Sequence, residues 1–480
     1  MLTKEYWAQL AQTQSELAEK ISADAWRLNY HLMPETGWMN DPNGLCQFKG
    51  VVHFYHQYVP QTPHGGEPPH WGHKTSTDYV TFQEEALFLS PEHDYDKDGV
   101  YSGSAFIEND AIHFFYTGNV KHPGDHDYTF SGREQNTVHV ISKDGYTVEK
   151  QEVVIPHEDY PEGFTDHIRD PKVFAHEDTY YMLLGARTLE NEGKILIYES
   201  TDLNEWTYRG IFFGEDYALG YMWECPDYFH LDGKDVLVFS PQGLAAKEHA
   251  YQNIHQSGYL IGEVDWETLT FKETSAFREL DYGFDFYAPQ TFEDEQKRRI
   301  LWGWMGLGDT SPEYSNPTIP RGWQHAATLP RQLSVKNDQL YQEPLPEFQK
   351  LRDKQVSQKI VLSEKPQHLS FDELAYELQV TAEAPLQHFQ LGLLQDTTLA
   401  YEAGVFTIHH GVSGYGRKQR SVKVDELMQL QIFVDTSSIE IFLNGGQYCL
   451  TSRVYPKRTE AIALSGTGTV CVNAWALARK

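Results

Sequence analysis

The sequence is poor in cysteine and in basic residues. Its four cysteines are scattered over 480 residues without a CxxC pair, which argues against a disulfide framework. Lysine and arginine number 39 against 69 aspartates and glutamates, so the formal net charge is −30. Nucleic acids and anionic membrane surfaces are bound through clustered cations. We therefore expect neither nucleic acid nor a membrane as a partner.

Long apolar segments are also lacking. No run of 18 or more apolar residues occurs, so no membrane span is expected. Residues 1–20 are charged throughout and have no apolar core of signal-peptide length. The spacing of Tyr6, Leu10 and Leu17 instead predicts a short amphipathic helix within a helical segment over residues 1–25. We expect a cytoplasmic protein whose thiols are reduced and mostly buried.

A repeated pattern dominates the first two thirds of the chain. Five segments each contain a short strand, a polar turn and an apolar strand, and they align on Pro42, Gly103, Pro171, Pro226 and Pro289. Consecutive anchors are 55 to 68 residues apart, and a near-constant long period indicates a repeat architecture. Several strands per repeat are typical of propeller blades. The pattern predicts a five-bladed β-propeller over residues 26–342.

Three of the five segments begin with a carboxylate beside a proline or cysteine: Asp41, Asp170 and Glu224. If equivalent positions of the blades face one axis, these side chains meet in one pocket. Two carboxylates flanking a glycosidic bond are the minimum for its hydrolysis, one attacking or activating water and the other protonating the leaving oxygen. An isolated Asp-Pro-Asn-Gly is more often a plain turn, but recurrence at equivalent strands favours the catalytic interpretation.

The pattern changes after residue 342. Pro344 and Pro346 interrupt regular structure, and residues 343–354 are interpreted as a linker with a short helix. From residue 355 to 480, apolar and polar residues alternate in several short runs, and Asn444-Gly445-Gly446 is a strong hairpin signal. Half-buried strands of this kind predict an antiparallel β-sandwich. Its role is structural or sugar-accessory, with a separate binding module as the alternative.

The motifs around the carboxylates resemble those of a known family. Residues 31–44 with WMNDPNG, 169–171 with RDP and 224–227 with ECPD are similar to the three signature boxes of glycoside hydrolase family 32. This family comprises invertases, sucrose-6-phosphate hydrolases and fructan hydrolases. Further agreement lies at residues 71–73, 101–105, 286–290, 303–306, 328–331 and 451–456. The resemblance implies an all-β chain, a five-bladed β-propeller followed by a C-terminal β-sandwich.

The resemblance also implies roles for individual residues. Asp41 would be the nucleophile, Glu224 the general acid and then the base, and Asp170 a stabiliser of the transition state that holds fructose hydroxyls. In a retaining enzyme the two catalytic carboxyls lie about 5–5.5 Å apart. No metal or cofactor is required. The matching substrate-binding positions are Asn40, Gln57, Trp71, Ser102, Arg169, Tyr287 and Trp304.

Two of these assignments have alternatives. Arg169 either faces the ligand or forms an ion pair that keeps Asp170 charged. Trp71 and Trp304 either wall the pocket or pack in the core. A metal site at His53 and His56 is not expected, because residues three apart in a strand point to opposite faces. The acidic loop through Asp94 lacks the glycine and terminal glutamate of a calcium loop.

Together with the carboxylate pattern, the resemblance implies a retaining β-fructofuranosidase acting on a small carbohydrate, sucrose or sucrose-6-phosphate. Hydrolysis of fructo-oligosaccharides, fructosyl transfer, and a non-catalytic sugar-binding propeller are the alternatives, and the oligomeric state is open. A phosphorylated leaving group requires cations, and Lys74, Arg133 and Lys247 are candidates. Lys74, Tyr79-Val80 and the extra polar loop at residues 120–132 depart from the family pattern where the leaving group is expected.

Overall fold

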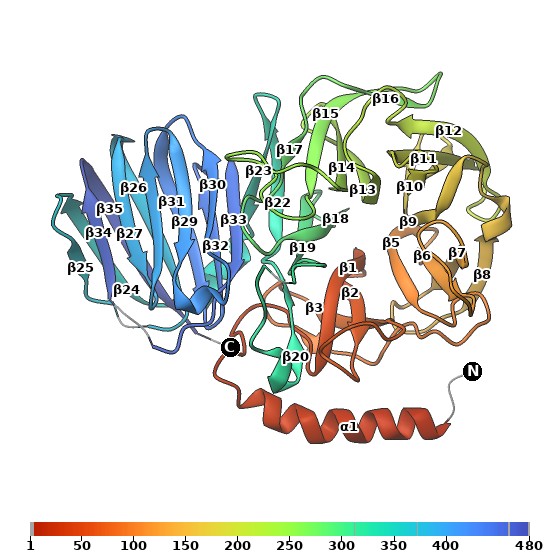
Figure 1. Cartoon of the computed structure of the whole chain (residues 1–480), viewed down its shortest axis with the longest axis horizontal. Helices are drawn as coiled ribbons and strands as arrows, with labels where there is room; N and C mark the ends of the chain where they lie inside the picture. The colour runs from red at the N-terminus through yellow and green to blue at the C-terminus, as the bar shows by residue number, and fades with distance from the viewer. Residues whose placement is uncertain (1–3, 312, 372, 459–460, 479–480) are drawn as a thin grey trace.

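Two bodies of β-sheet lie side by side, one with blades around an axis and the other layered (Figure 1). The computed structural model describes residues 4–311, 313–371, 373–458 and 461–478. The helices in these residues are α1 (Lys4–Ser22) and the short 3-10 helices η1 (His157–Asp159), η2 (Ile319–Arg321), η3 (Pro346–Leu351) and η4 (Val412–Gly414). The predicted all-β architecture, a five-bladed propeller followed by a sandwich, is confirmed.

Five sheets form the propeller, and their strand pairs are antiparallel except for β20 with β1. In spatial order, blade one contains β20 (Trp323–Gln324), β1 (Gly37–Phe48), β2 (Val51–Val59), β3 (His70–Ser76) and β4 (Gln83–Glu84). Blade two contains β5 (Val100–Glu108), β6 (Ala111–Lys121), β7 (Arg133–Ser142) and β8 (Lys150–Ile155). Blade three contains β9 (Phe164–His176), β10 (Thr179–Thr188), β11 (Gly193–Ser200) and β12 (Thr207–Phe213).

The last two blades carry one additional short strand each. Blade four contains β13 (Met222–Leu231), β14 (Lys234–Gln242), β15 (Gly258–Asp265) and β16 (Thr270–Glu273), with β17 (Arg278–Glu279) beside β15. Blade five contains β18 (Tyr287–Glu293), β19 (Arg299–Met305), β22 (Arg331–Lys336) and β23 (Gln339–Pro344), with β21 (Ala326–Ala327) beside β19. The late strand β20 pairs in parallel with β1, so the end of the propeller segment is fastened to its beginning.

Two six-stranded sheets form the sandwich. One contains β24 (Arg352–Val361), β35 (Thr469–Leu477), β26 (Tyr376–Leu386), β31 (Leu427–Asp435), β32 (Ser438–Leu443) and β33 (Tyr448–Arg453). The other contains β25 (Gln367–Leu369), β34 (Ile462–Gly466), β27 (His388–Leu393), β28 (Thr397–Glu402), β29 (Val405–His410) and β30 (Gln419–Lys423). Their facing side chains, among them Leu378, Leu391 and Ile432, form one buried apolar core, as two packed sheets require.

The first strand of every blade is irregular at the position that the sequence repeat marks. The pairing register shifts between Met39 and Pro42 in β1, Val100 and Gly103 in β5, Arg169 and Lys172 in β9, Glu224 and Asp227 in β13, and Tyr287 and Gln290 in β18. A bulge bends a strand and re-aims its side chains. Proline fits there because it has no N–H for the ladder. Neighbouring side chains such as Arg169 and Asp170 thereby reach the same cavity.

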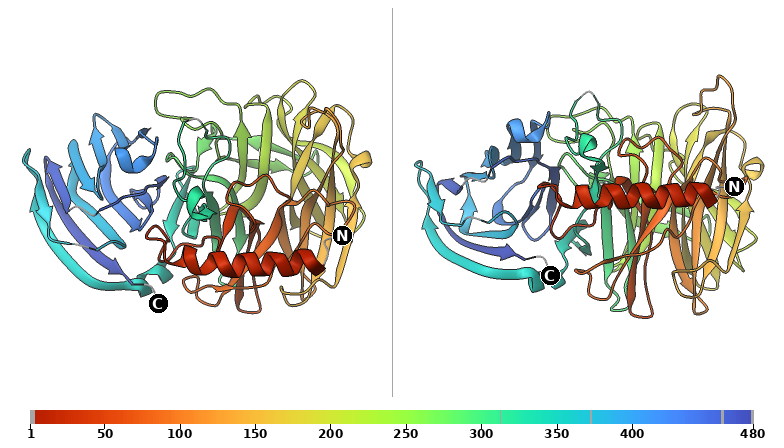
Figure 2. Two further views of the ribbon diagram at one scale, coloured as in Figure 1. Left: turned by 60° about the horizontal axis from the view of Figure 1, so that its bottom comes forward. Right: turned by 90° about the horizontal axis from the view of Figure 1, so that it is seen from below.

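Helix α1 runs along one face of the propeller toward the sandwich (Figure 2). Leu10 and Ile21 are its buried apolar contacts, and Ile21 packs with Trp26, Trp323 and Tyr455. These partners come from both bodies, so the N-terminal segment helps to join the propeller to the sandwich. No helix among the described residues has the length and apolarity needed to cross a membrane.

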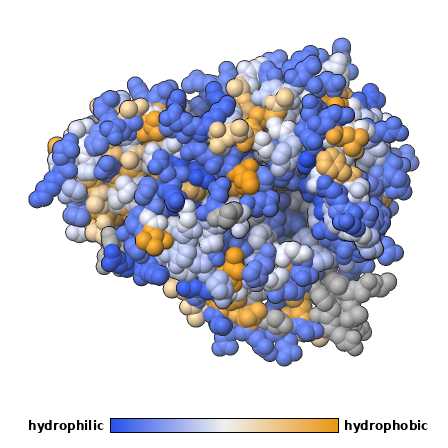
Figure 3. All heavy atoms as spheres, viewed as in Figure 1, coloured by the Kyte–Doolittle hydropathy of each residue, from blue (hydrophilic) through white to orange (hydrophobic). Residues whose placement is uncertain are grey.

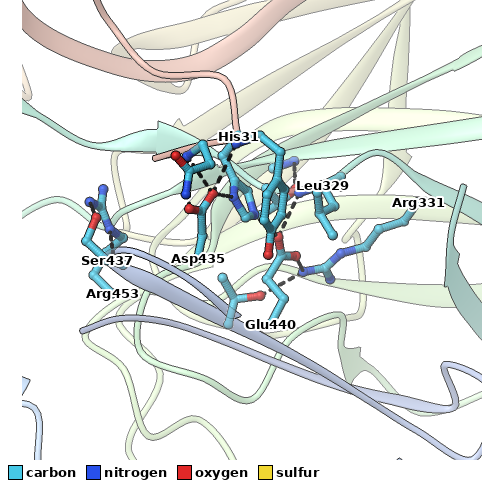
Figure 4. A network of polar contacts seen from close by, with 12 residues as sticks. His31, Leu329, Arg331, Asp435, Ser437, Glu440 and Arg453 are labelled. Carbon is cyan, nitrogen blue, oxygen red and sulfur yellow. Dashed lines mark hydrogen bonds and ion pairs between the residues drawn. The ribbon is translucent and has the colours of Figure 1, made fainter. Parts of the chain in front are cut away.

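A buried polar network crosses the interface between the two bodies (Figure 4). His31 contacts Asp435 through Nδ1 and Glu440 through Nε2, each at 2.9 Å. The other oxygen of Glu440 accepts a hydrogen bond from Arg331 at 2.8 Å, and all four of these side chains are fully buried. Glu440 Oε1 also accepts the Leu329 N–H at 2.8 Å. Buried charges need such complete pairing, because an unpaired one is costly.

We expect His31→Gln to destabilise the protein more at pH 6 than at pH 9. Burial lowers the pKa of His31, but the hydrogen bonds to Asp435 and Glu440 outweigh it, so the pKa is raised. A raised histidine pKa contributes stability that is complete below the unfolded value and is lost as pH rises through the folded value. Breaking the buried pair should cost about 3 kcal/mol at pH 6.

Thermal unfolding followed by circular dichroism at both pH values measures this effect. The matched control is His368→Gln on β25, where the side chain is exposed. An equal loss of melting temperature at pH 6 and pH 9 would show that His31 contributes packing and not charge.

Candidate active site

A hollow lies in the middle of the propeller face in Figure 3, where hydrophilic residues predominate. The cavity that contains the motif residues has a volume of about 510 Å³, a size typical of small-molecule sites. Nine of the ten site residues predicted from the sequence line it: Asn40, Asp41, Gln57, Ser102, Arg169, Asp170, Glu224, Tyr287 and Trp304. Segments separated by more than 200 residues in sequence thus contribute to one polar pocket.

Asp41 on β1 is held by two hydrogen-bond donors. Ser102 Oγ donates to Asp41 Oδ2 at 2.6 Å, and the Asn40 amide donates to Asp41 Oδ1 at 3.1 Å. The indole N–H of Trp38 donates to Asn40 Oδ1 at 2.8 Å. Because an indole can only donate, this contact fixes the Asn40 amide with its NH₂ toward Asp41. The carboxylate is therefore fixed in position before any substrate arrives.

Asp170 on β9 occupies a left-handed backbone conformation with φ of 62°, which is uncommon for a residue with a side chain. Its Oδ2 accepts the backbone N–H of Cys225 at 2.9 Å, and its own N–H donates to Thr117 Oγ1 at 3.1 Å. The thiol of Cys225 lies 3.6 Å from Asp170 Oδ2 and 3.9 Å from Asp41 Oδ2. Cys225 thus stands between the two aspartates.

The pKa values of both aspartates are raised toward neutrality. Burial raises the pKa of Asp41 to about 6, with repulsion from Glu224 adding to it and the Ser102 hydrogen bond opposing it. Burial raises the pKa of Asp170 to about 7, against attraction from Arg169 and with repulsion from Glu224 and Asp41. Interacting carboxyls titrate as a group, so the cluster exchanges protons near neutral pH.

Glu224 on β13 accepts hydrogen bonds from three side chains. Tyr287 Oη donates to Oε2 at 2.6 Å, Gln242 Nε2 donates to Oε2 at 2.8 Å, and Arg169 Nη2 lies 2.9 Å from Oε1. The side chain of Glu224 is 15% exposed, so it faces the cavity. Arg169 therefore forms its ion pair with Glu224, while its charge also lowers the pKa of the neighbouring Asp170. The bulge in β9 separates these neighbours and turns the guanidinium toward Glu224.

The two tryptophans predicted to bind substrate lie in different surroundings. Trp304 on β19 lines the cavity, with its ring 6.4 Å from that of Tyr287 and 5.9 Å from that of Trp38. Trp71 on β3 is fully buried among core aromatics and does not line the cavity. Its indole N–H donates to the Tyr101 carbonyl at 3.0 Å. The prediction that Trp71 binds substrate is therefore corrected, since its side chain supports the wall from behind.

Sequence reasoning missed several residues of the cavity. Trp38, Tyr101, Gln242 and His255 line it together with the predicted set. Trp38 lies within a recognised motif and could have been included. Gln242 and His255 are joined by an isolated bridge between β14 and the loop after it, and no pattern in the sequence marks them.

The arrangement has the elements of acid–base chemistry on a sugar. The cavity is lined by Asp41, Asp170 and Glu224 from three different blades. Hydroxyl, amide and guanidinium groups surround them, which suits a polyhydroxylated ligand. Two carboxyls on either side of the scissile bond, one to attack and one to protonate the leaving oxygen, are what glycoside hydrolysis requires.

Comparisons with known proteins show which family the chain resembles. The model described as "Glycosyl hydrolases family 32 N-terminal domain" matches residues 31–344, and "Glycosyl hydrolases family 32 C terminal" matches residues 347–475. The chain is 39% identical over 462 residues to a sucrose-6-phosphate hydrolase of Bacillus subtilis, covering 93% of each chain. It is 37% identical over 466 residues to a raffinose invertase of Escherichia coli, covering 93% of this chain and 94% of the relative.

A solved structure extends the similarity to three dimensions. The structure of a sucrose-6-phosphate hydrolase from Lactobacillus gasseri superposes with a TM-score of 0.86 at 31% identity, covering 97% of this chain and 96% of the other. Both family models together span nearly the whole length from residue 31 onward. The chain belongs to glycosyl hydrolase family 32.

Proposed function

We propose that the protein is a retaining β-fructofuranosidase that releases fructose from sucrose or sucrose-6-phosphate. The observation that carries the proposal is the cavity in which Asp41 is clamped by Ser102 and Asn40 and which Glu224 also lines, held by three hydrogen-bond donors. The names of the relatives, sucrose-6-phosphate hydrolase and raffinose invertase, support a fructosyl substrate.

In the first step, Asp41 attacks the anomeric carbon of the fructosyl unit and forms a covalent ester. Glu224 donates a proton to the glycosidic oxygen, so the leaving sugar departs as a neutral alcohol. The fixed orientation of Asp41 reduces the entropy cost of the attack. Tyr287 and Gln242 hold the carboxyl of Glu224 on the leaving-group side.

In the second step, Glu224 takes a proton from water, and the resulting nucleophile breaks the ester and frees Asp41. This reversal of the proton transfer is required of a retaining glycosidase. Asp170 makes no bond to carbon. Its carboxyl, anchored by the Cys225 N–H, binds fructose hydroxyls and stabilises the positive charge that develops on the sugar ring.

Two alternatives share parts of this proposal. A fructosyltransferase or a fructo-oligosaccharide hydrolase would use the same ester but a different acceptor or leaving group. A non-catalytic sugar-binding propeller would not need to keep both a clamped nucleophile and an acid. We also propose a cytoplasmic location, supported by the unpaired state of the four cysteines, three of which are buried.

The test is the product formed from sucrose in water and in dilute methanol. We expect equal amounts of glucose and fructose in water, and methyl β-fructofuranoside in methanol, identified by nuclear magnetic resonance. The α-anomer would contradict a covalent intermediate on Asp41. Glucose released in large excess over fructose would favour the transferase, and absence of any product would favour the binding module.

A further inference from the structure

Two cations without carboxylate partners lie near the cavity between blades two and three, Lys121 in its lining and Arg133 beside the lining residue Tyr101. Lys121 at the end of β6 is exposed and lines the cavity, with its Nζ 5.9 Å from the ring centroid of Tyr128. The guanidinium of Arg133 at the start of β7 lies 6.0 Å from the ring of Tyr101, which also lines the cavity. Among the described residues, neither cation forms an ion pair, which is unusual in a chain of net charge −30.

Arg133 also lacks a satisfactory hydrogen-bond acceptor. Its Nη1 lies 3.2 Å from His167 Nε2, while Arg169 Nη2 lies 2.7 Å from His167 Nδ1. Burial, with repulsion from Arg169 and Arg133, lowers the pKa of His167 to about 2, so the imidazole is neutral. A neutral imidazole has a single acceptor nitrogen, and the shorter contact assigns it to Arg169. Arg133 then faces an N–H, and its buried Nε has no partner within the described part of the chain.

These contacts connect Arg133 to Glu224, the residue to which we assign protonation of the leaving group. His167 connects it to Arg169, and Arg169 is 2.9 Å from Glu224 Oε1. A guanidinium with free donors is suited to two oxygens of a phosphate. The ammonium group of Lys121 adds positive charge nearby, and its flexible side chain can adapt to the position of the phosphate.

The other two candidate cations lie elsewhere. Lys74 is buried on β3 and paired with Glu84. Lys247 is an exposed residue of the loop after β14, with its Nζ 4.8 Å from the ring of Tyr251. Neither lysine lines the cavity, and their partners Glu84 and Tyr251 do not line it either, whereas Arg133 lies against the lining residue Tyr101. A further cation, Arg187, already has a hydrogen-bond acceptor, because its Nε and Nη2 both donate to Asn191 Oδ1.

We propose that Arg133 and Lys121 form a binding site for a phosphomonoester carried by the leaving sugar. The inference rests on the proposed function and specifies its preferred substrate class, a phosphorylated over a neutral disaccharide. The polar loop at residues 120–132 joins the two cations, so its departure from the family pattern has a role in recognising the leaving group.

The test compares kcat/KM for sucrose-6-phosphate and sucrose in the wild type, Arg133→Gln, Lys121→Gln and the control Lys247→Gln. We expect the wild type to prefer the phosphorylated sugar by about 10- to 100-fold, the range for charge-assisted hydrogen bonds. Arg133→Gln should remove most of this preference and change sucrose hydrolysis less than about threefold. Lys121→Gln should reduce it by about three- to tenfold, and Lys247→Gln should leave it unchanged.

Product inhibition supplies a readout that does not depend on catalysis of the phosphorylated sugar. Glucose-6-phosphate should inhibit sucrose hydrolysis by the wild type far better than glucose or inorganic phosphate, and Arg133→Gln should lose that difference. Equal losses on both sugars would show that Arg133 only positions His167 and Arg169, and would overturn the inference. A wild type that cleaves sucrose without preferring its phosphate would overturn it too, while the proposed function stands. Inactivity on both sugars would overturn the proposed function itself.

Discussion

Asp41→Asn is expected to lower kcat/KM for sucrose by about 10⁴-fold or more while the protein stays folded. Loss of the nucleophile removes the covalent pathway, and nucleophile deletions in other enzymes have effects of this size. Asparagine keeps the shape of aspartate and can still accept the hydrogen bond from Ser102 Oγ, although its NH₂ cannot accept the hydrogen bond from Asn40. Initial rates of fructose release, with melting temperature as the folding check, measure the effect.

The matched control for this variant is Asp94→Asn, which removes an exposed carboxylate of the same propeller and should retain wild-type activity. A residual activity of Asp41→Asn above about one tenth of wild type would exclude Asp41 as the nucleophile.

The same residue predicts the acid limb of the wild-type pH profile. Burial raises the pKa of Asp41 to about 6, and only the ionised carboxylate attacks carbon. The protonated fraction grows as pH falls through this value, and Asp170 with a pKa of about 7 is protonated over the same range, so kcat/KM, which reports the free enzyme, should fall at least about tenfold per unit below pH 6. A profile that stays flat down to about pH 4 would contradict the raised value.

The sequence could predict the meeting of Asp41, Asp170 and Glu224 because a propeller repeats one strand geometry around an axis. The alignment does not, however, place the three carboxylates at one position of the repeat. Counted from the anchor prolines, Asp41 and Asp170 occupy the same position, whereas Glu224 aligns with Arg169. In a regular strand these two positions would point to opposite faces. The bulges in β9 and β13 direct both into the cavity, which lets Arg169 pair with Glu224.

The sequence could not predict the contacts that depend on how blades and strands pack against one another. Trp71 belongs to a recognised motif, yet its indole is enclosed by Tyr55, Phe114 and Tyr116, because its position on β3 points into the space between blades one and two. Gln242 belongs to the second strand of its blade and reaches Glu224 through the register of β13 with β14. Such residues are identified by the register, which depends on the whole fold.

Glu224→Gln should separate substrates by the quality of their leaving groups. A general acid contributes about 10²- to 10⁴-fold, and sucrose needs it fully because a sugar alkoxide is a poor leaving group. We expect kcat/KM for sucrose to fall about 10³-fold and that for an aryl β-fructofuranoside with an acidic phenol to fall less than about tenfold. We compare kcat/KM because this constant reports the steps up to formation of the ester, which include the protonation of the leaving group.

The second step provides an independent test of the same residue. Without its base, Glu224→Ala should accumulate the fructosyl ester from the aryl substrate, so release of the phenol shows a burst followed by slow turnover. Azide attacks carbon without needing deprotonation, and it should restore kcat and yield fructosyl azide with the β configuration. An equal loss on both substrates, or turnover that azide does not change, would move the acid–base role away from Glu224. The outcome would then favour Asp170, whose pKa of about 7 also lets it carry a proton at neutral pH.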